Sequence, residues 1–154
     1  MWGEKVLIAR FANLIETFAT PNVGALSNVL ATVGLASNQL DVKRAGIFPI
    51  VHGARSLAVE QGILVQPTVE RVEALVEVGL LEPDFGKELI SALHFFMELR
   101  LRSQVEAIRL GTAQNAEVSL DSLTSAERDI LRDGLRVVRR LRELIRHRYH
   151  LGNL

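Results

Sequence analysis

The longest amphipathic pattern in the chain runs from residue 84 to residue 111. Apolar residues recur there at spacings of three and four, which predicts one α-helix with a wide apolar stripe. The stripe consists of Leu89, Ile90, Leu93, Phe96, Met97, Leu101, Val105 and Ile108. At a rise of 1.5 Å per residue this helix is about 40 Å long. We therefore expect the rest of the chain to pack around it.

Four further segments have helical periodicity: residues 4–18, 48–61, 68–78 and 124–149. The helix at 48–61 is predicted to begin with Pro49 in its first turn and to end at Gly62. The helix at 68–78 is predicted to be capped by Thr68 and to end at Gly79. The last helix begins with a capping box, Thr124-Ser-Ala-Glu127. Its predicted inner stripe is Ile130, Leu131, Leu135, Val137, Val138, Leu141, Leu144 and Ile145.

Three stretches lack a helical pattern. Residues 22–40 fit either a short hairpin turning near Gly34 or a loose helix. Residues 41–46 are interpreted as a charged turn in which Gly46 supplies backbone freedom. Residues 112–122 have no core-forming pattern and are interpreted as a polar surface loop.

These elements predict an all-α fold, an up-and-down bundle of about five helices with two long antiparallel ones and a short hairpin at 25–40 as an optional addition. A chain of 154 residues suits a single domain, so residues 1–154 are predicted to form one helical bundle. The pattern begins almost at residue 1. We therefore expect a C-terminal fragment of a longer multidomain protein, with residues 1–20 as a linker helix from the preceding domain.

Composition excludes several classes of function. No apolar run is long enough to cross a bilayer, and the N-terminus lacks a signal-peptide pattern. We therefore expect a cytoplasmic protein that does not bind or span a membrane. The absence of cysteine excludes disulfides and thiolate chemistry. No glycine-rich phosphate loop and no nucleotidyltransferase pattern of Gly-Ser with closely spaced aspartates is present, so the chain by itself is not expected to be an enzyme. His147 and His150, three residues apart without an orienting carboxylate, make a poor metal pair.

Positive charge concentrates in the last predicted helix. Residues 124–149 contain eight arginines against four acidic residues. No aromatic residues are interleaved with the arginines, and Asp129, Asp133 and Glu143 can act as partners within the helix. This pattern favours a solvated or partner-facing surface over binding of nucleic acid.

One constellation of polar residues accompanies the apolar pattern. It consists of Asp41, Lys43, His52, Arg55, Arg100 and Gln104. One interpretation is a buried salt-bridge network in which Asp41 or Glu98 neutralises Arg55 or Arg100, because buried arginines usually have a carboxylate partner. The other interpretation is a ligand site. Both require Asp41, Arg55 and Arg100 to converge in space.

Four segments of the sequence resemble a known family. They are residues 40–51 (LDVKRAGIFPIV), 54–58 (ARSLA), 68–71 (TVER) and 99–104 (LRLRSQ). In this order and spacing they resemble the family of putative nucleotidyltransferase substrate-binding domains, from about residue 11 to the C-terminus. The family pattern falls on Asp41, Lys43, Gly46, Pro49, Arg55, Thr68, Arg71, Leu99, Arg100 and Gln104.

The resemblance implies a non-catalytic accessory domain of a nucleotidyltransferase in a bacterial signal-transduction protein. The catalytic domain, with its nucleotide and Mg²⁺, is expected upstream, alongside cyclic-nucleotide-binding and CBS domains, and no cofactor is expected in this chain. The expected partners are these upstream domains or a second copy in a homodimer. Candidate substrate-binding residues are Asp41, Lys43, His52, Arg55, Arg71, Arg100 and Gln104. The alternative is a dimerisation or docking module without its own ligand.

Overall fold

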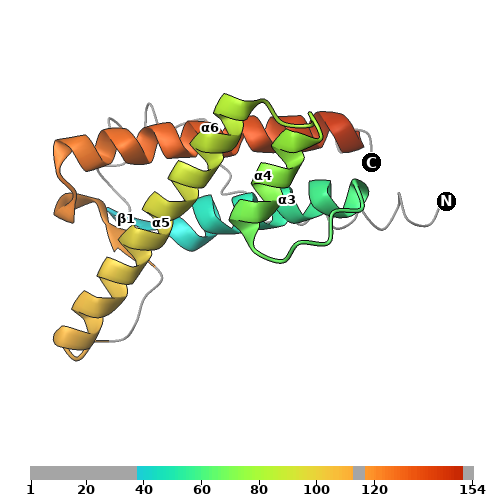
Figure 1. Ribbon diagram of the computed structural model, residues 1–154. Coiled ribbons are helices and arrows are strands. Elements are labelled where there is room, and N and C mark those ends of the chain that lie inside the picture. The colour runs from blue at the N-terminus through green and yellow to red at the C-terminus, as the bar shows by residue number, and fades with distance from the viewer. Residues whose placement is uncertain (1–37, 113–116, 151–154) are drawn as a thin grey trace.

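A computed structural model describes residues 38–112 and 117–150 of the chain. In these residues four α-helices dominate: α3 (Phe48–Glu60), α4 (Thr68–Glu77), α5 (Pro83–Arg109) and α6 (Ser125–Tyr149), as Figure 1 shows. The prediction of an all-α fold is confirmed, with four of the five expected helices close to their predicted bounds. The helix predicted at residues 4–18 and nearly all of the hairpin or helix predicted at 22–40 lie outside the described residues.

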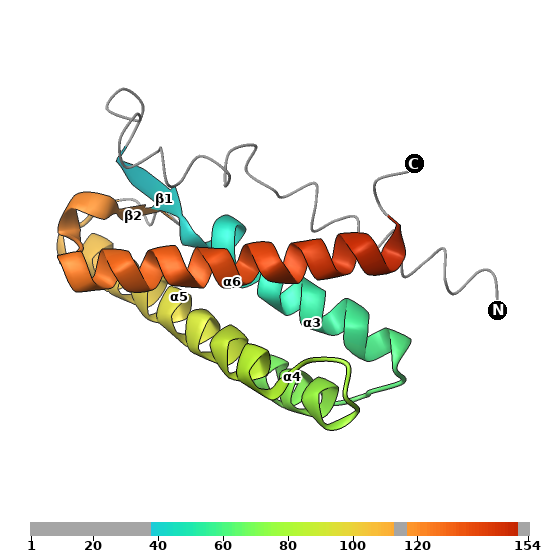
Figure 2. The ribbon, with the colours of Figure 1, turned by 90° about the horizontal axis from the view of Figure 1, so that it is seen from above.

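The two long helices, α5 and α6, run antiparallel, as predicted. Arg102, late in α5, forms an ion pair of 2.6 Å with Glu127 in the first turn of α6. At the other end, Arg140 of α6 reaches Glu82, which directly precedes α5, at 3.1 Å. The helices cross at an angle (Figure 2), and the C-terminal half of α5 projects away from α6 (Figure 1).

The predicted apolar stripe of α5 is only half correct. Leu89, Leu93 and Phe96 are buried. Met97, Leu101, Val105 and Ile108 are exposed instead. At about 100° per residue these four lie roughly 100–180° around the helix from Phe96, on the side away from the core. Spacings of three and four accumulate into a row that turns around the helix, so the predicted stripe combined two faces of α5.

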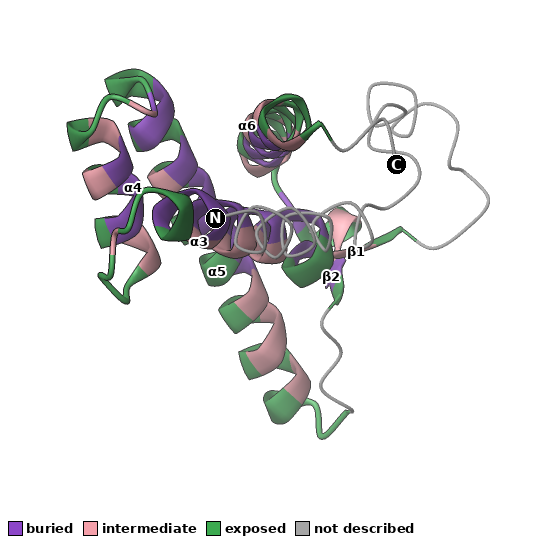
Figure 3. Ribbon diagram, turned by 90° about the vertical axis from the view of Figure 1, so that its right-hand side faces the viewer, coloured by how far each residue is buried: buried purple, intermediate pink, exposed green. Residues whose placement is uncertain are grey.

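The core is centred on Phe96 of α5, whose side chain is fully buried between two glycines (Figure 3 shows the buried faces of the helices turned toward one another). A Cβ atom built on Gly46 would lie 2.4 Å from Phe96 Cδ2, and one on Gly134 of α6 would lie 3.0 Å from Phe96 Cζ. The backbone dihedral φ of Gly46 is not positive. The prediction that Gly46 supplies backbone freedom is therefore wrong, since its role is to leave room for the ring.

A small antiparallel sheet joins the end of the segment predicted as a hairpin or loose helix (22–40), together with the first residue of the predicted turn, to the predicted surface loop. Strand β1 (Gln39–Asp41) pairs with strand β2 (Glu117–Ser119), with Leu40 opposite a buried Val118. After β1 the chain forms a π-helical turn, η2 (Lys43–Ile47), which continues directly into α3. A 3-10 turn, η3 (Leu120–Ser122), follows β2. A three-residue strand leaves almost no pattern in the sequence, because its pairing partner is far away along the chain.

The helix ends confirm most of the predicted signals. Gly62 and Gly79 have positive φ angles, of 68° and 74°, just after α3 and α4. The prediction for Thr68 is wrong: Pro67 is the N-cap residue of α4, and no side chain caps this helix. The inner stripe of α6 is also correct except at Ile130, which is half exposed because it lies on the side of α6 away from the core.

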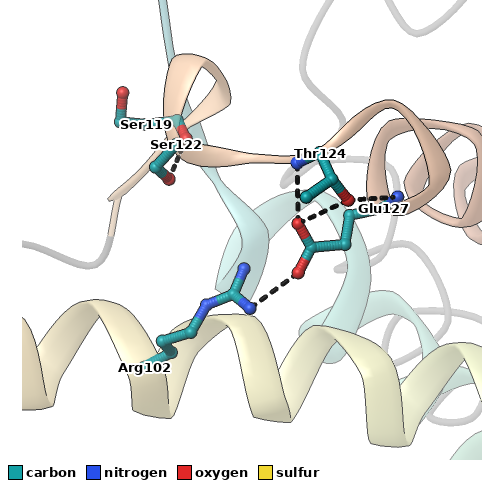
Figure 4. A network of polar contacts seen from close by, with 5 residues as sticks. All are labelled: Arg102, Ser119, Ser122, Thr124 and Glu127. Carbon is teal, nitrogen blue, oxygen red and sulfur yellow. Dashed lines mark hydrogen bonds and ion pairs between the residues drawn. The ribbon is translucent and has the colours of Figure 1, made fainter.

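The capping box of α6 is present and is joined to α5 (Figure 4). Glu127 accepts hydrogen bonds from the backbone N–H of Thr124 (2.7 Å), from Thr124 Oγ1 (2.9 Å) and from Arg102 Nη1 (2.6 Å). These donors, the Thr124 N–H first and Arg102 next, lower the pKa of Glu127 from 4.5 to about 2. The box therefore fixes the start of α6 against α5.

We expect Glu127→Gln to destabilise the fold at neutral pH and to have little effect in strong acid. A carboxyl group with a lowered pKa in the folded state adds stability above its unfolded pKa of about 4.5, and this stability is lost as the pH falls toward about 2. Urea unfolding of both proteins across this pH range measures the difference. Glu106→Gln, which removes an exposed carboxylate 3.9 Å from Arg109, serves as the control. A Glu127→Gln effect that is independent of pH would contradict the role of the charge.

Candidate functional site

Three of the predicted site residues come together where α3 packs against α4. His52 and Arg55 lie one turn apart on α3, and Arg71 lies in the first turn of α4. The side chain of Arg71 is only 8% exposed, and its Nε donates a hydrogen bond of 2.9 Å to the carbonyl oxygen of Val65. This bond orients the guanidinium group and leaves its two terminal nitrogens for another partner.

The two arginines form a positively charged cluster, and His52 lies next to Arg55. Burial lowers the pKa of Arg71, and the nearby charge of Arg55 lowers it further. The pKa of His52 is lowered below 6.5 by the same two causes, burial first and Arg55 second. Among residues 38–112 and 117–150, neither Arg55 nor Arg71 forms an ion pair with a carboxylate. Like charges gathered without a counter-charge disfavour the folded state unless an anion binds there.

The neutral form of His52 is the form that the fold favours. Because its pKa in the folded state lies below 6.5, the unfolded chain takes up a proton first as the pH falls, and the fold loses stability below about pH 6.5. The ring of His52 stacks on Phe48 with 3.9 Å between ring centroids. This stacking fixes the orientation of the His52 ring next to Arg55.

The remaining predicted residues lie on other elements. Asp41 ends β1 and accepts a hydrogen bond of 3.1 Å from the backbone N–H of Arg44, while Lys43 is exposed in η2. Arg100 and Gln104 are half-buried on α5. The Nε of Arg100 is buried without a hydrogen-bond partner in the described part of the chain.

The interpretation of these residues as a buried salt-bridge network is wrong. Within the described ranges, neither Asp41 nor Glu98 forms an ion pair with Arg55 or Arg100. The structure joins His52, Arg55 and Arg71, and it shows no contact from Asp41 or Arg100 to Arg55. The convergence of Asp41, Arg55 and Arg100 that both interpretations required is therefore not observed, and a ligand at His52, Arg55 and Arg71 stays a prediction.

Two contributions to this region were not predicted from the sequence. One is the carbonyl oxygen of Val65, which no side-chain pattern can reveal because it is a backbone atom. The other is a network at the end of α6, in which Tyr149 donates to Glu60 Oε2 at 2.8 Å and Arg148 Nε reaches the same oxygen at 2.7 Å. Burial and then Glu60 raise the pKa of Tyr149. This network joins the C-terminal end of α3 to the end of α6. The only tyrosine in the sequence, Tyr149, is the one residue type that could have indicated it.

The arginine-rich face of α6 is largely occupied by ion pairs. Arg132 pairs with Asp129 at 2.7 Å and Arg136 with Asp133 at 2.8 Å, as the spacing predicted. Arg140 bridges to Glu82 and Glu88 near the start of α5. These pairs favour a structural and solvated role for the helix over contact with phosphates of nucleic acid.

The described residues contain neither a candidate metal site nor a helix that could span a membrane. No group of three or more His, Cys, Asp or Glu side chains in residues 38–112 and 117–150 has the arrangement needed to hold a metal ion. None of the helices in these ranges combines the length and apolar character required to span a bilayer.

Comparisons with known proteins place the chain in a family. Neither the curated proteins nor the solved structures that were searched contain a match. One family model matches nearly the whole chain, and the match includes the segments with His52, Arg55, Arg71, Arg100 and Gln104. The chain therefore belongs to the family of putative nucleotidyltransferase substrate-binding domains, whose model matches residues 5–149.

Proposed function

We propose that this domain is the non-catalytic substrate-binding part of a nucleotidyltransferase that acts in bacterial signal transduction. In this proposal a separate upstream domain binds the nucleotide and Mg²⁺ and performs the transfer. The domain described above recognises an anionic group of the acceptor substrate and holds it for that reaction. Family membership supports the accessory role, and the residues on the α3 and α4 surfaces supply the chemistry.

The observation that carries the proposal is the buried Arg71 beside Arg55 without a carboxylate partner among the described residues. A guanidinium group presents paired N–H donors that match the oxygens of a phosphate or carboxylate. An anion placed between the two arginines removes their mutual repulsion. His52 then supplies a hydrogen bond whose strength depends on its protonation.

The other candidate residues have supporting roles in this proposal. Arg100, with its buried and unsatisfied Nε, is a second anion contact, and Gln104 is a hydrogen-bonding group one turn further along α5. The hydrogen bond between Asp41 and the Arg44 N–H fixes the turn that presents Lys43. These four residues lie on β1, η2 and α5, and their contact with other parts of a larger substrate belongs to the proposal.

Titration of His52 by NMR in the presence of pyrophosphate tests the proposal. We expect the pKa of His52 to lie below 6.5 in the free protein, because of burial and Arg55. Bound pyrophosphate adds negative charge beside the imidazole, so the pKa of His52 should rise. His147, an exposed residue on α6, is the internal control and should not shift. Equal shifts of both histidines, or no shift of His52, would contradict specific binding of an anion at this place.

A further inference from the structure

The projecting half of α5 has four exposed apolar side chains on one face. Met97, Leu101, Val105 and Ile108 are 53%, 62%, 46% and 63% exposed. They follow one another at spacings of four, four and three, so they form a single row, which we call the α5 stripe. Figures 1 and 3 show that this half of α5 extends away from the other described helices. A continuous row of this kind is typical of a surface that binds a partner.

The residues along the edge of the α5 stripe suggest which partner it binds. Glu98 and Arg109 are eleven residues apart, close to three full helical turns, so they lie on the same edge of the stripe. Glu98 forms no ion pair within the described residues, and Arg109 has only a loose contact of 3.9 Å with Glu106. One edge of the stripe therefore has an acidic group at one end and a basic group at the other.

This arrangement is complementary to itself. When two copies of α5 lie antiparallel about a twofold axis near residue 103, Met97 faces Ile108 of the second copy and Leu101 faces its Val105. In the same register Glu98 faces Arg109 of the second copy, and Arg109 faces its Glu98. In an antiparallel helix pair, corresponding edges of the two stripes meet, so both ion pairs form at once. Arg102 lies on the same edge, two turns before Arg109, and the axis brings it near the Arg102 of the second copy, but its charge is already paired with Glu127 at 2.6 Å within each chain.

We propose that the α5 stripe is a homodimerisation surface on which a second copy of this chain binds in antiparallel orientation. A second copy fits this charge pattern better than an apolar partner of another kind. Glu98 and Arg109 are too far apart to pair within one helix, but a twofold axis places each beside the other residue of the second copy. A single helix pair lies at the small end of interface sizes, so the dimer forms at high micromolar rather than nanomolar concentration. The α5 stripe is separate from Arg55 and Arg71, which lie on α3 and α4. Gln104, which the proposed function also uses, lies three residues after Leu101 at the edge of the stripe, so the dimer covers one residue of the proposed substrate site.

Sedimentation velocity of the 154-residue chain over a wide range of concentrations tests dimer formation. The wild-type chain is expected to shift from monomer to dimer as the concentration rises. Leu101→Asp places a charge in the middle of the α5 stripe and should weaken dimerisation at least tenfold. Leu64→Asp, at a residue that is 88% exposed in the loop before α4, is the matched control and should leave dimerisation unchanged. Circular dichroism confirms that both variants are folded.

Exchange of the two charges tests the register. Glu98→Arg and Arg109→Glu should each weaken the dimer, and the double variant should restore it. Within one chain these residues are roughly 16 Å apart along the helix, too far for an ion pair, so restoration requires contact between copies.

Three results would overturn the proposal. The first is a chain that stays monomeric at every concentration. The second is a dimer that the double charge exchange does not restore. The third is a Leu101→Asp variant that is less stable than the wild-type chain at concentrations where both are monomeric, which would indicate that the α5 stripe is covered within a single chain.

Discussion

Gly46→Ala is expected to destabilise the domain by about 1–3 kcal/mol, although it adds a single methyl group. The added Cβ would lie 2.4 Å from Phe96 Cδ2 and 2.5 Å from Phe96 Cε2, so one of the two groups has to move. The ring cannot simply retreat, because Gly134 of α6 lies against its opposite side. The free energy of unfolding in urea measures this effect.

A double-mutant cycle with Phe96 tests the reason for this loss. Phe96→Ala alone should cost about 3–5 kcal/mol, since it empties a fully buried position. In that background Gly46→Ala should cost much less, because the ring that it meets is gone. Gly134→Ala is the graded control, with a Cβ distance of 3.0 Å and a smaller expected loss. If Gly46→Ala lowered the free energy of unfolding equally in the Phe96→Ala background, glycine would be required at position 46 for its backbone conformation.

Arg55→Ala is expected to weaken pyrophosphate binding by roughly ten- to a hundredfold, the effect of losing one charge-assisted hydrogen bond of about 1.5–3 kcal/mol. The same change should leave the stability of the free protein unchanged or raise it. Arg55 lowers the pKa values of both Arg71 and His52, so its removal relieves repulsion in the folded state. Calorimetric titration and urea unfolding measure the two effects separately.

The direction of the stability change separates a binding site from an internal strut. An arginine in a buried ion pair destabilises the fold strongly when it is removed. Loss of stability together with loss of binding in Arg55→Ala would therefore favour the docking module without a ligand. Arg136→Ala is the matched control, because it removes an exposed α6 arginine that pairs with Asp133 and should leave pyrophosphate binding unchanged.

The fold supports the arginine cluster from two directions. The loop before α4 orients Arg71 through the Val65 carbonyl. The end of α6 holds α3 through Tyr149 and Arg148, which share the carboxylate of Glu60. Arg55 and Arg71 are only sixteen residues apart in the sequence, yet the position of the helix that carries Arg55 depends on residues near the C-terminus. The cluster is therefore sensitive to any movement of α6 against α3.

The sequence was sufficient to predict the helices and their boundaries because these depend on neighbouring residues. The periodicity of α5, the Thr124 capping box, and Gly62 and Gly79 at helix ends are all interactions within a few residues. The intrahelical pairs of Arg132 and Arg136 are local in the same sense. The sequence also predicted the residue types of the candidate site, through the resemblance to the family.

Only the tertiary structure decided which of those residues meet. It placed Arg71 beside Arg55 with no carboxylate partner among the described residues, and it exposed the whole α5 stripe. It also packed Gly46 against Phe96 and paired β1 with β2. Each of these depends on the distance between segments far apart along the chain. Local patterns determine the conformation of a segment, whereas the packing of α5 against η2 and α6 determines which of its apolar side chains are buried.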